Sequence, residues 1–527
     1  MEKVRNLLIV LIVFTSLICK AKQEQKLPFI QMKEGFCQLI VNGQPFIMLA
    51  GELHNSSASS LKYMDPIWDK LTEMHLNTVI ATVSWELFEP AEGKYDFSLV
   101  DGLINGAREH QVKLVLIWFG TWKNSWSTYV PEWVKIDLKR FPRMQTKPGE
   151  NSGALSAFGE NTMKADAKAF AQLMKHIRDV DRNEQTVLMM QVENETGVLN
   201  TSRDHSSMAE KQFSEHVPSE LINYLKSHSE RLMSEMKAIL KSSGKLNGSW
   251  KEVFGASADE VFQAWYTARF VGKVTASGKE AYNIPMYVNA WLDGSFSTSV
   301  KPEYPSGGPI SKMMDVWRAA APGIDLFAPD IYLDDFKRVC SFYSQSGNPI
   351  FIPEAQRDPR AASNVYYALG QYNAICFSPF GIDGTITSNL SGVYGSLSGF
   401  LPFFAQHQGV NNNRGLLLSG NTEELVELGG YKIKITYNQK RDEEKNISES
   451  AGIILTTTRG EFYIGGFGFR VDFMTLDGKC WVETLSHEQG TFDNGVWVPE
   501  RRMNGDEMDI MLSSKPEFRK IKVHTIN

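Results

Sequence analysis

The sequence has few of the features that mark metal-binding or disulfide-rich proteins. Only five of its 527 residues are cysteines, and those beyond the N-terminal segment are far apart, at Cys37, Cys340, Cys376 and Cys480. No two form a Cys-x-x-Cys pair, and the histidines show no pair at metal-binding spacing, so we expect neither a metal nor a cofactor. Four cysteines are too few for a disulfide scaffold in so long a chain, and we expect them to be buried small hydrophobic residues.

A strong charge of one sign is also missing. The chain has 55 Lys and Arg against 61 Asp and Glu, a formal net charge of −6, and both signs are mixed along it. Binding along a phosphate backbone requires a basic stripe, which the sequence lacks, so we do not expect nucleic acid as a partner. A neutral, polar substrate needs no strong field and fits this balance.

Long apolar runs are absent beyond the first residues, so no membrane span is expected. At the start, Lys3 and Arg5 precede an almost wholly apolar run from Leu7 to Ile18. That run is too short to cross a bilayer as a helix but is typical of a signal peptide. We therefore expect residues 1–22 to be a signal peptide and the protein to be secreted, periplasmic or exposed at the cell surface.

Cys19 leaves a second interpretation open, in which it is a site of lipid attachment. The residue before it is Ile18, where a small residue is preferred. Cleavage after Ala21, with Cys19 as the other small residue near the cleavage point, fits the signal-peptide interpretation better.

The main pattern of the sequence is an alternation of apolar runs with segments of helical periodicity. Eight such runs lie between Leu27 and Gln408, at residues 46–53, 78–85, 112–120, 186–195, 284–291, 324–332, 349–354 and 373–382. This alternation is typical of a parallel sheet with crossover helices, and eight repeats favour a closed (β/α)8 TIM barrel over an open sheet. We expect residues 27–408 to form this barrel, with a charged helical layer at 208–277; a separate inserted domain there is the less favoured alternative.

The pattern changes beyond Gln408. Short β-prone runs separated by Gly, Asn and Asp continue to the C-terminus, for example in GLLLSG, YKIKITY and GIILTTT. This pattern predicts an all-β sandwich over residues 409–527, so the chain belongs to the α/β class with an added β domain.

Two carboxylates stand at the ends of facing strands in this barrel. Glu195 (in QVENETG) ends the fourth apolar run and Glu354 (in FIPEAQ) ends the seventh. The active site of a TIM barrel lies at the carboxyl ends of its strands, and a retaining glycoside hydrolase needs two carboxyl groups about 5–5.5 Å apart. This arrangement predicts Glu354 as nucleophile and Glu195 as general acid, then general base. Burial and the charge of Glu354 should raise the pKa of Glu195.

Other strand-end residues are candidate sugar contacts. Asn194 can donate to the sugar 2-hydroxyl, whereas alternation turns Glu193 to the other face, where a structural role is expected. Tyr332 is expected to donate its hydroxyl to Glu354, and Asp330 is expected to be structural. Further candidates for substrate binding are Glu52, His54, Trp85 and Asn289. A structural network is an equal alternative for Glu52 and His54, and burial in the core is an equal alternative for Trp85.

The motif QVENETG strongly resembles the acid/base motif of glycoside hydrolase family 35, the β-galactosidases with catalytic carboxylates on strands four and seven. Further matches follow in the order of that family: AGELHNSS (50–57), VSWELFEPAEGKYDF (83–97), VPEWV (130–134) and EYPSGGP (303–309). The C-terminal β domain resembles the accessory domain of a bacterial branch of this family.

The resemblance has one clear departure after the third strand. Many members of family 35 have a Cys-Ala-Glu-Trp-like turn there, whose Glu helps to bind the sugar, but this chain has WFGTWKNSW (118–126). Lys123 or Asn124 is the candidate for that polar role. Trp122 and Trp126 of the same loop, and Trp291 at the end of the fifth strand, are candidate stacking platforms for sugars.

The resemblance implies an exo-acting, cofactor-free β-galactosidase that works by double displacement on a carbohydrate partner. Plant cell-wall side chains such as galactosylated xyloglucan are one implied source of substrate. Two alternatives remain open: another retaining β-glycosidase, such as an arabinopyranosidase or a glucosidase, and a carbohydrate-binding protein that has lost catalysis. The intact pair of Glu195 and Glu354 argues against the latter. The sequence leaves the oligomeric state open.

Overall fold

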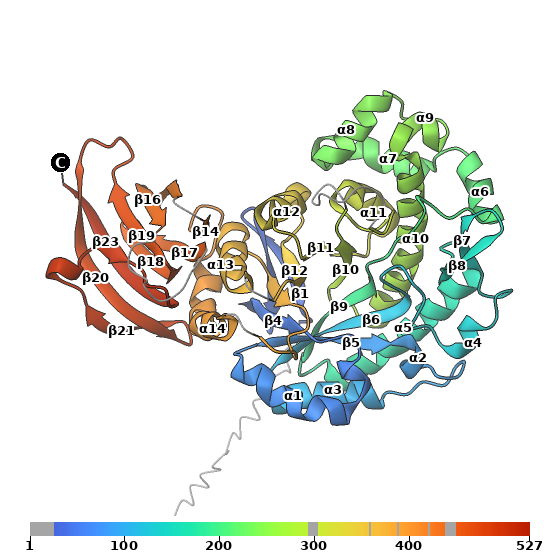
Figure 1. The fold of residues 1–527 in the computed structure, drawn as a ribbon, viewed down its shortest axis with the longest axis horizontal. Coiled ribbons are helices and arrows are strands. Elements are labelled where there is room, and N and C mark those ends of the chain that lie inside the picture. Colours follow the sequence, from blue (N-terminus) through green and yellow to red (C-terminus); the bar gives the residue numbers. More distant parts are fainter. Residues whose placement is uncertain are drawn as a thin grey trace, which may run out of the picture.

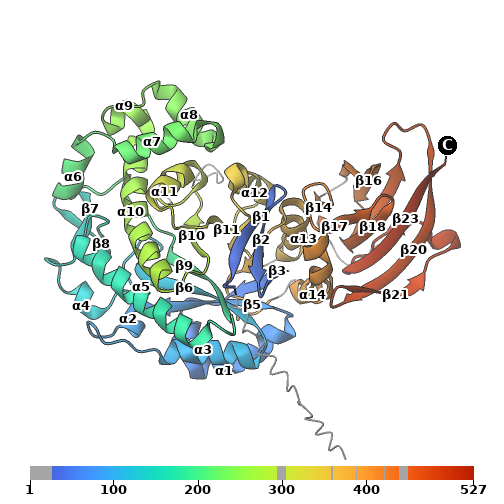
Figure 2. The same cartoon turned by 180° about the vertical axis from the view of Figure 1, so that it is seen from behind.

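The computed structural model describes residues 26–293, 304–357, 360–386, 389–419, 422–437 and 449–526. The expected signal peptide (1–22) and the alternative lipid site at Cys19 lie outside these residues. Figures 1 and 2 show two parts side by side, a barrel wrapped in helices and a smaller all-β part that ends with the C-terminus.

Eight parallel strands close into a barrel in the spatial order β10-β11-β12-β13-β4-β5-β6-β9. Each overlaps one of the predicted apolar runs, so the predicted TIM barrel is confirmed. The strands are β4 (Met48–Glu52), β5 (Thr78–Ser84), β6 (Lys113–Lys123), β9 (Val187–Asn194), β10 (Met286–Trp291), β11 (Leu326–Ile331), β12 (Phe351–Ala355) and β13 (Cys376–Pro379).

Helices follow the strands around the outside of the barrel (Figure 1). The main outer helices are α1 (Leu61–Glu73), α3 (Ser98–Glu109), α5 (Glu160–Asp181), α10 (Ala258–Ala281), α11 (Met314–Ala320), α12 (Phe336–Tyr343), α13 (Ala361–Tyr372) and α14 (Leu390–His407). Shorter elements lie in the loops: α2 (Trp85–Phe88), α4 (Glu132–Lys135), and a hairpin of β7 (Arg143–Lys147) and β8 (Glu150–Leu155).

The long connection between β9 and β10 is helical, as predicted. Four helices precede α10 and lie near it and α11 in Figure 1: α6 (Ser207–Ser214), α7 (Ser219–Ser227), α8 (Ser234–Ser243) and α9 (Trp250–Phe254). They pack Leu221, Met236 and Trp250 into the main hydrophobic core, so they form an added layer on the barrel.

One end of the barrel is closed by a small N-terminal sheet of β1 (Phe29–Lys33), β2 (Phe36–Val41) and β3 (Gln44–Phe46). Leu39 and Val41 of β2 join the apolar cluster inside the barrel, beside residues that begin strands, such as Met48 and Phe351. The amino ends of the strands are therefore plugged, which leaves the carboxyl ends as the mouth.

The C-terminal part is all-β, as predicted, and consists of a six-stranded and a four-stranded antiparallel sheet around a shared core. The first sheet has the order β14 (Asn413–Ser419), β17 (Glu449–Thr458), β18 (Glu461–Phe467), β23 (Glu517–Ile526), β20 (Trp481–Asp493) and β21 (Val496–Arg502). The second has the order β15 (Glu423–Leu428), β16 (Tyr431–Tyr437), β19 (Phe469–Met474) and β22 (Ile510–Met511).

Helix α14 contacts both parts. The hydroxyl of Tyr394 lies 3.0 Å from the backbone oxygens of both Ala50 and Phe377, which belong to barrel strands, and its single proton is shared between these two acceptors. Farther along α14, the ring of Phe400 lies 5.1 Å from that of Phe492 and 4.8 Å from that of Phe518, measured between centroids. The two parts therefore share a continuous aromatic interface.

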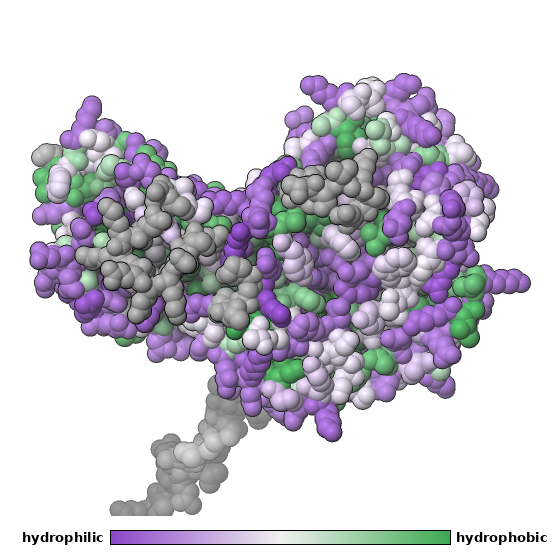
Figure 3. All heavy atoms as spheres, in the orientation of Figure 1, coloured by the Kyte–Doolittle hydropathy of each residue, from purple (hydrophilic) through white to green (hydrophobic). Residues whose placement is uncertain are grey.

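The cysteines and the surface of the molecule were also subjects of prediction. Cys340 and Cys376 are buried as predicted, but Cys37 and Cys480 are only half-buried, so that expectation was wrong for these two. Among the described residues, no helix is both long and apolar enough to cross a bilayer. Hydrophilic residues predominate on the face seen in Figure 3, where apolar residues form only small separate groups.

Candidate active site

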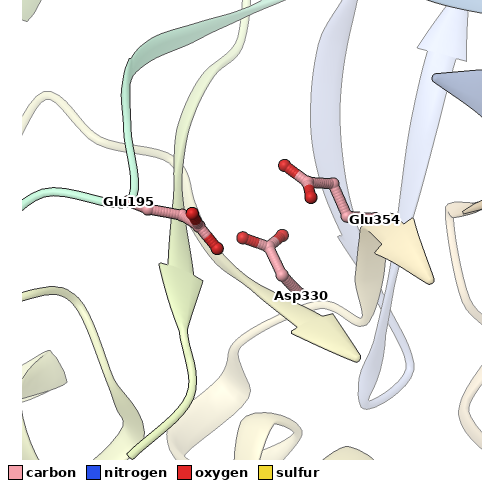
Figure 4. A group of neighbouring side chains, drawn as sticks. All are labelled: Glu195, Asp330 and Glu354. Carbon is pink, nitrogen blue, oxygen red and sulfur yellow. The ribbon is translucent and has the colours of Figure 1, made fainter. Parts of the chain in front are cut away.

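Three carboxyl groups converge at the mouth of the barrel. Glu195 follows β9, Asp330 lies in β11 and Glu354 lies in β12 (Figure 4). One oxygen atom of each lies within 4.8 Å of an oxygen atom of the other two, and all three side chains are buried. The sequence predicted that Glu195 and Glu354 would meet, and the structure brings them together.

The backbone at the end of β9 allows neighbouring side chains to share one face. Glu193 and Glu195 have φ values of +64° and +43°, in the left-handed region that non-glycine residues rarely adopt. Strict alternation would send Asn194 and Glu195 to opposite faces. Instead, Asn194 donates its amide to Glu354 at 3.4 Å, and Glu195 points at the same cluster. This is local strain at a site whose geometry is fixed by its surroundings.

Glu354 accepts more donated hydrogen bonds than the other two carboxyl groups. The hydroxyl of Tyr332 lies 2.6 Å from its Oε2, and the amides of Asn194 and Asn289 lie 3.4 Å from its Oε1. Donors of this kind stabilise the charged form of a carboxyl group. The predicted contact of Tyr332 with Glu354 is confirmed, and the same contact and burial raise the pKa of Tyr332, with burial the larger cause.

Asn289 connects the three acidic residues. Its Oδ1 accepts a hydrogen bond from the backbone N–H of Glu195 at 2.9 Å, and its Nδ2 donates to Oδ2 of Asp330 at 2.8 Å. The side chain is buried, and its amide is used by protein groups. The structure thus gives Asn289 a role in holding the cluster, whereas the sequence suggested a sugar contact.

Glu195 has the electrostatic surroundings that its predicted role requires. Burial, and next the negative charge of Glu354, raise the pKa of Glu195 to about 7, while the charge of Lys123 acts in the opposite direction. A carboxyl group with such a pKa holds its proton in a large fraction of molecules at neutral pH, as a general acid must.

Asp330, which the sequence predicted to be structural, lies within the cluster of acids at the mouth. Its carboxyl group lies between Glu195 and Glu354 (Figure 4). Burial, followed by the charges of Glu354 and Glu195, raises its pKa well above the usual range of aspartate. Its Oδ1 atom has no hydrogen-bond donor among the residues that the structure describes. The sequence did offer a signal that Asp330 lies at the site, because it is a polar residue near the end of an apolar run, but many other strand ends have the same pattern.

Glu52 is buried in the same region at the end of β4. Only 1% of the residue is exposed, and neither of its carboxyl oxygens has a hydrogen-bond partner in the described part of the chain. Burial, and next the charge of Glu354, raise the pKa of Glu52 well above the usual range, while Lys123 opposes this shift. A buried carboxyl group without partners is costly unless a bound molecule supplies them.

The loop after β6 brings Lys123 near the cluster. Lys123 and Trp126 are joined by two backbone hydrogen bonds around Asn124 and Ser125, which both have positive φ. The hydroxyl of Ser125 donates to the backbone oxygen of Glu195 at 3.0 Å, which fixes this turn against the site. Lys123 thus acts on Glu52 and Glu195 through its charge. Oδ1 of Asn124 is buried with no partner among the described residues, and its predicted role in sugar binding stays a prediction.

Glu193 is structural, as predicted. It is fully buried and accepts hydrogen bonds from the backbone N–H groups of Thr121 at 3.1 Å and Trp122 at 2.7 Å. These bonds tie β9 to the end of β6. Glu193 therefore positions the loop that carries Lys123, on the side of the strand away from the mouth.

The aromatic candidates differ in what they expose. Of the two alternatives for Trp85, the structure supports burial in the core: Trp85 is fully buried, donates its indole N–H to Glu89 at 2.7 Å, and packs against Trp118 and Trp133, which excludes the contact with substrate. Trp122 is buried as well, which excludes it as a stacking platform. Trp126, in the turn after β6, and Trp291, the last residue of β10, are 39% and 36% exposed, so both stay candidate stacking platforms.

His54 lies at the rim and depends on a residue that the sequence reasoning missed. Its Nδ1 lies 2.9 Å from Oδ1 of Asp383, which also accepts a hydrogen bond from the hydroxyl of Ser57 at 2.6 Å through Oδ2. The side chain of His54 is about half exposed. Asp383 follows the eighth strand, and a polar residue at that place was the available signal. The predicted role of His54 in sugar binding stays a prediction.

The three carboxyl groups are close enough for one cation to contact them all. Acidic groups gather at this spacing in a two-carboxylate active site as well, and an acidic cluster alone does not define a metal site. The donor set therefore carries no assignment of a metal or cofactor.

Comparison with known proteins adds two family matches. The model Glyco_hydro_42, described as beta-galactosidase, matches residues 54–263, and a domain of unknown function (DUF5597) matches residues 390–514. The first match supports a β-galactosidase-like barrel and is not specific to family 35, whose motifs the sequence resembles. No curated protein matches the sequence of this chain.

Several solved structures are similar in fold. The β-galactosidase of Bacillus circulans sp. alkalophilus is 15% identical with a TM-score of 0.42, and the match covers 63% of this chain and 50% of that chain. The β-galactosidase of the psychrophilic Marinomonas ef1 is 11% identical with a TM-score of 0.44, covering 68% and 60%. The β-1,4-D-mannanase of Cryptopygus antarcticus is 12% identical with a TM-score of 0.43, covering 71% and 95%. This chain thus spans half to three fifths of the two β-galactosidase chains.

The segment matched by the glycoside hydrolase family includes β9 and the Glu195 that follows it. Residues 54–263 are therefore similar to a β-galactosidase family, and this part of the barrel carries one of the two paired acids at the mouth.

Proposed function

We propose that this chain is a retaining exo-β-galactosidase, related to family 35, that releases terminal β-galactose from oligosaccharides. The observation that carries the proposal is the spacing of the two acids: oxygen atoms of Glu195 and Glu354 lie within 4.8 Å of each other. Retaining enzymes hold their carboxyl groups about 5–5.5 Å apart, whereas inverting enzymes leave roughly 6.5–9.5 Å for a water molecule.

In the proposed first step, Glu354 attacks the anomeric carbon and forms a glycosyl ester. Glu195 gives its proton to the oxygen of the leaving group at the same time, and its pKa of about 7 suits this role. Three donated hydrogen bonds support the charged form of Glu354 before attack.

In the proposed second step, Glu195 takes a proton from water, which attacks the same carbon and releases Glu354. The charge of Glu354 is absent in the ester, so the pKa of Glu195 falls and the group can act as a base. Galactose then leaves with the configuration it had in the substrate.

Glu52 and Lys123 are the proposed contacts for sugar hydroxyl groups. The two unpartnered oxygens of Glu52 need donors, which sugar hydroxyl groups supply, and the ammonium group of Lys123 can donate to hydroxyl oxygens. Asn194 is the proposed donor to the 2-hydroxyl. Trp126 and Trp291 are the exposed rings on which more distant sugars of a xyloglucan-type side chain can stack.

The sugar specificity is tested by kcat/KM on 4-nitrophenyl glycosides. We expect the β-galactoside to be the best substrate, and β-glucoside or α-arabinopyranoside as the best substrate would replace galactose in the proposal. NMR of the first sugar released should show the β-anomer, because double displacement retains configuration. Release of the α-anomer would contradict the assigned roles.

The roles of the two acids are tested with paired variants. Glu195→Ala should lose about 10²–10⁴-fold in rate on substrates with poor leaving groups, retain turnover of dinitrophenyl galactoside, and gain a β-galactosyl azide product when azide is added. Glu354→Ala should lose activity with every leaving group. A 2-deoxy-2-fluorogalactosyl inhibitor should label the peptide that contains Glu354, and a label on any other peptide would overturn the nucleophile assignment.

We also propose that the chain is exported, on the basis of the apolar run from Leu7 to Ile18. N-terminal sequencing of the protein from the native host should give a mature start after residue 21 or 22. A mature start at Cys19 carrying lipid would support the lipoprotein alternative, and an intact Met1 in the cytoplasm would reject export.

A further inference from the structure

The charge distribution among the three buried carboxyl groups is constrained by their hydrogen bonds. Glu354 accepts from Tyr332, Asn194 and Asn289, so it is the group best able to hold a negative charge. Asp330 receives one donated hydrogen bond, from Asn289 to Oδ2, and its Oδ1 has no donor among the described residues. Three acids this close cannot all be ionised without a large electrostatic cost.

A proton on Oδ1 of Asp330 would remove the electrostatic cost of a third negative charge, and it would give this oxygen atom a hydrogen bond to make. Carboxyl oxygens of Asp330 and Glu195 lie within 4.8 Å of each other, so Glu195 is the neighbouring acid toward which this proton can be donated. Asp330 would then be a satisfied, neutral donor instead of a buried anion with an empty oxygen.

We propose that Asp330 is a positioning residue for the acid/base Glu195, to which its protonated carboxyl group donates a hydrogen bond throughout the reaction. The proposal rests on the proposed role of Glu195. In the first step, Glu195 passes its own proton to the leaving oxygen, and the resulting carboxylate is stabilised by the hydrogen bond from Asp330. In the second step, Glu195 takes a proton from water, while Asp330 keeps its proton in both steps.

Asn289 fixes the positions of Asp330 and Glu195 relative to each other. It accepts from the backbone N–H of Glu195 and donates to Asp330, so the two acids are fixed to each other through one buried amide. The left-handed backbone at Glu195 turns its side chain to the same point. A carboxyl group that only braced a strand would need no such arrangement around the acid/base.

The ionisable groups that face Asp330 come from several elements. Burial and the negative neighbours Glu354, Glu195 and Glu52 all favour its neutral form, which agrees with the raised pKa of Asp330. The set comprises Glu195 after β9, Glu354 on β12, Glu52 on β4, Tyr287 on β10, Tyr332 after β11 and Tyr343 on α12, with Lys123 of β6 acting on Glu195. Lys123 is the single positive charge of this set.

The protonation of Asp330 can be measured without turnover. In the full-length protein with ¹³C-labelled aspartate, we compare infrared spectra of the parent and of Asp330→Asn at neutral pH. The difference should contain the carbonyl band of a protonated aspartic acid that the variant lacks. A difference band of an ionised carboxylate at neutral pH would overturn the proposal, whether or not the protein hydrolyses galactosides.

Activity then tests the coupling to Glu195 through the basic limb of the pH profile of kcat/KM. Asp330→Ala removes the donor, so the pKa of Glu195 should rise and the limb should move upward by about one unit. Asp330→Asn keeps an N–H donor and should leave the limb nearly in place. If Asp330 were ionised, both variants would move the limb downward, because a negative charge would be lost, and the proposal would be wrong.

Asp334→Asn is the matched control, since Asp334 lies beyond the end of β11 with its side chain mostly exposed and paired with Arg360. Its pH profile and infrared difference should show neither effect. Thermal unfolding of the two Asp330 variants checks that each is folded. A parent that cleaves no glycoside would reject the proposed function, while the infrared result would still decide the protonation of Asp330.

Discussion

Glu195 and Glu354 are the same amino acid, and their surroundings separate their roles. Glu354 is surrounded by donors, whereas Glu195 has its backbone N–H fixed by Asn289 and its carboxyl group close to two other acids. Burial and like charge raise the pKa of a carboxyl group, and donated hydrogen bonds favour its charged form. The surroundings of Glu354 therefore fit the proposed nucleophile, and those of Glu195 fit the proposed general acid.

The first prediction concerns the pH dependence of activity. The pKa of Glu195 is raised to about 7, so its protonated, active form is present below this pH and is lost as the pH rises through it. We expect kcat/KM for a 4-nitrophenyl β-galactoside to fall along a basic limb near pH 7. Dinitrophenyl galactoside, whose leaving group needs no proton, is the control and should show a weaker limb. A basic limb near the usual pKa of glutamate would contradict this prediction.

The second prediction concerns Tyr332. Replacing it in Tyr332→Phe removes the 2.6 Å hydrogen bond to Glu354, which destabilises the charged form of the nucleophile. A hydrogen bond to a charged group contributes about 1.5–3 kcal/mol, so we expect kcat/KM at neutral pH to fall about tenfold or more. The acid limb of the pH profile should move to higher pH.

The matched control for Tyr332→Phe is Tyr63→Phe on α1, which removes an exposed hydroxyl and should leave the profile unchanged. An unaltered acid limb in Tyr332→Phe would mean that this hydroxyl does not support the charge on Glu354.

At the scale of elements, the end of β9 and the turn after β6 work as one unit. Glu193 fixes β9 to the backbone at Thr121 and Trp122, and Ser125 returns a hydrogen bond to the backbone of Glu195. The unit places Lys123 near Glu195 on a turn with two residues of positive φ. The side chain of Glu193 thus positions the turn that carries Lys123 without reaching the mouth.

The third prediction tests that unit through Lys123→Met. Removing the positive charge should raise the pKa of Glu195, because Lys123 now lowers it, and should move the basic limb upward by about half a unit, since solvent screens part of this charge. KM should rise as well if Lys123 contacts the sugar. Lys147→Met on the exposed hairpin is the control for loss of a lysine. A basic limb that moves downward or stays in place would show that the charge of Lys123 does not lower the pKa of Glu195.

At the scale of the whole molecule, the barrel and the β domain meet through α14. Tyr394 anchors the helix to two barrel strands, and Phe400 packs against Phe492 and Phe518 of the β domain. The DUF5597 match begins at residue 390, the first residue of α14, so that family includes the helix together with the strands. Disruption of this interface should therefore affect both parts.

The fourth prediction is that Phe518→Ala destabilises the barrel as well as the β domain. The ring is buried, and truncation of a buried Phe costs about 3–5 kcal/mol. We expect activity loss on heating and unfolding seen by circular dichroism to shift together to lower temperature. Phe29→Ala, at an exposed position, is the control. Activity that survives while the β domain melts alone would show that the parts unfold independently.

The sequence predicted the elements better than their contacts. The apolar runs placed all eight strands because burial on both faces of a parallel sheet leaves a strong local signal. Glu195 and Glu354 were found because each ends such a run within a specific motif. The sequence left two alternatives for Trp85, because a tryptophan beside a strand end is as compatible with the core as with the mouth, and only its packing against Trp118 and Trp133 decides for the core.

By itself, the sequence determined the barrel and the all-β domain, because local burial leaves apolar runs that mark the strands along the chain. It also determined the two acids that face each other, because each ends such a run. Only the tertiary structure decided how those acids are tuned. The third carboxyl group at Asp330, the bridging amide of Asn289 and the unpartnered oxygens of Glu52 arise where β4, β10, β11 and β12 converge. A pKa and a hydrogen-bond network depend on distances between groups far apart in the chain, and no local pattern encodes those distances.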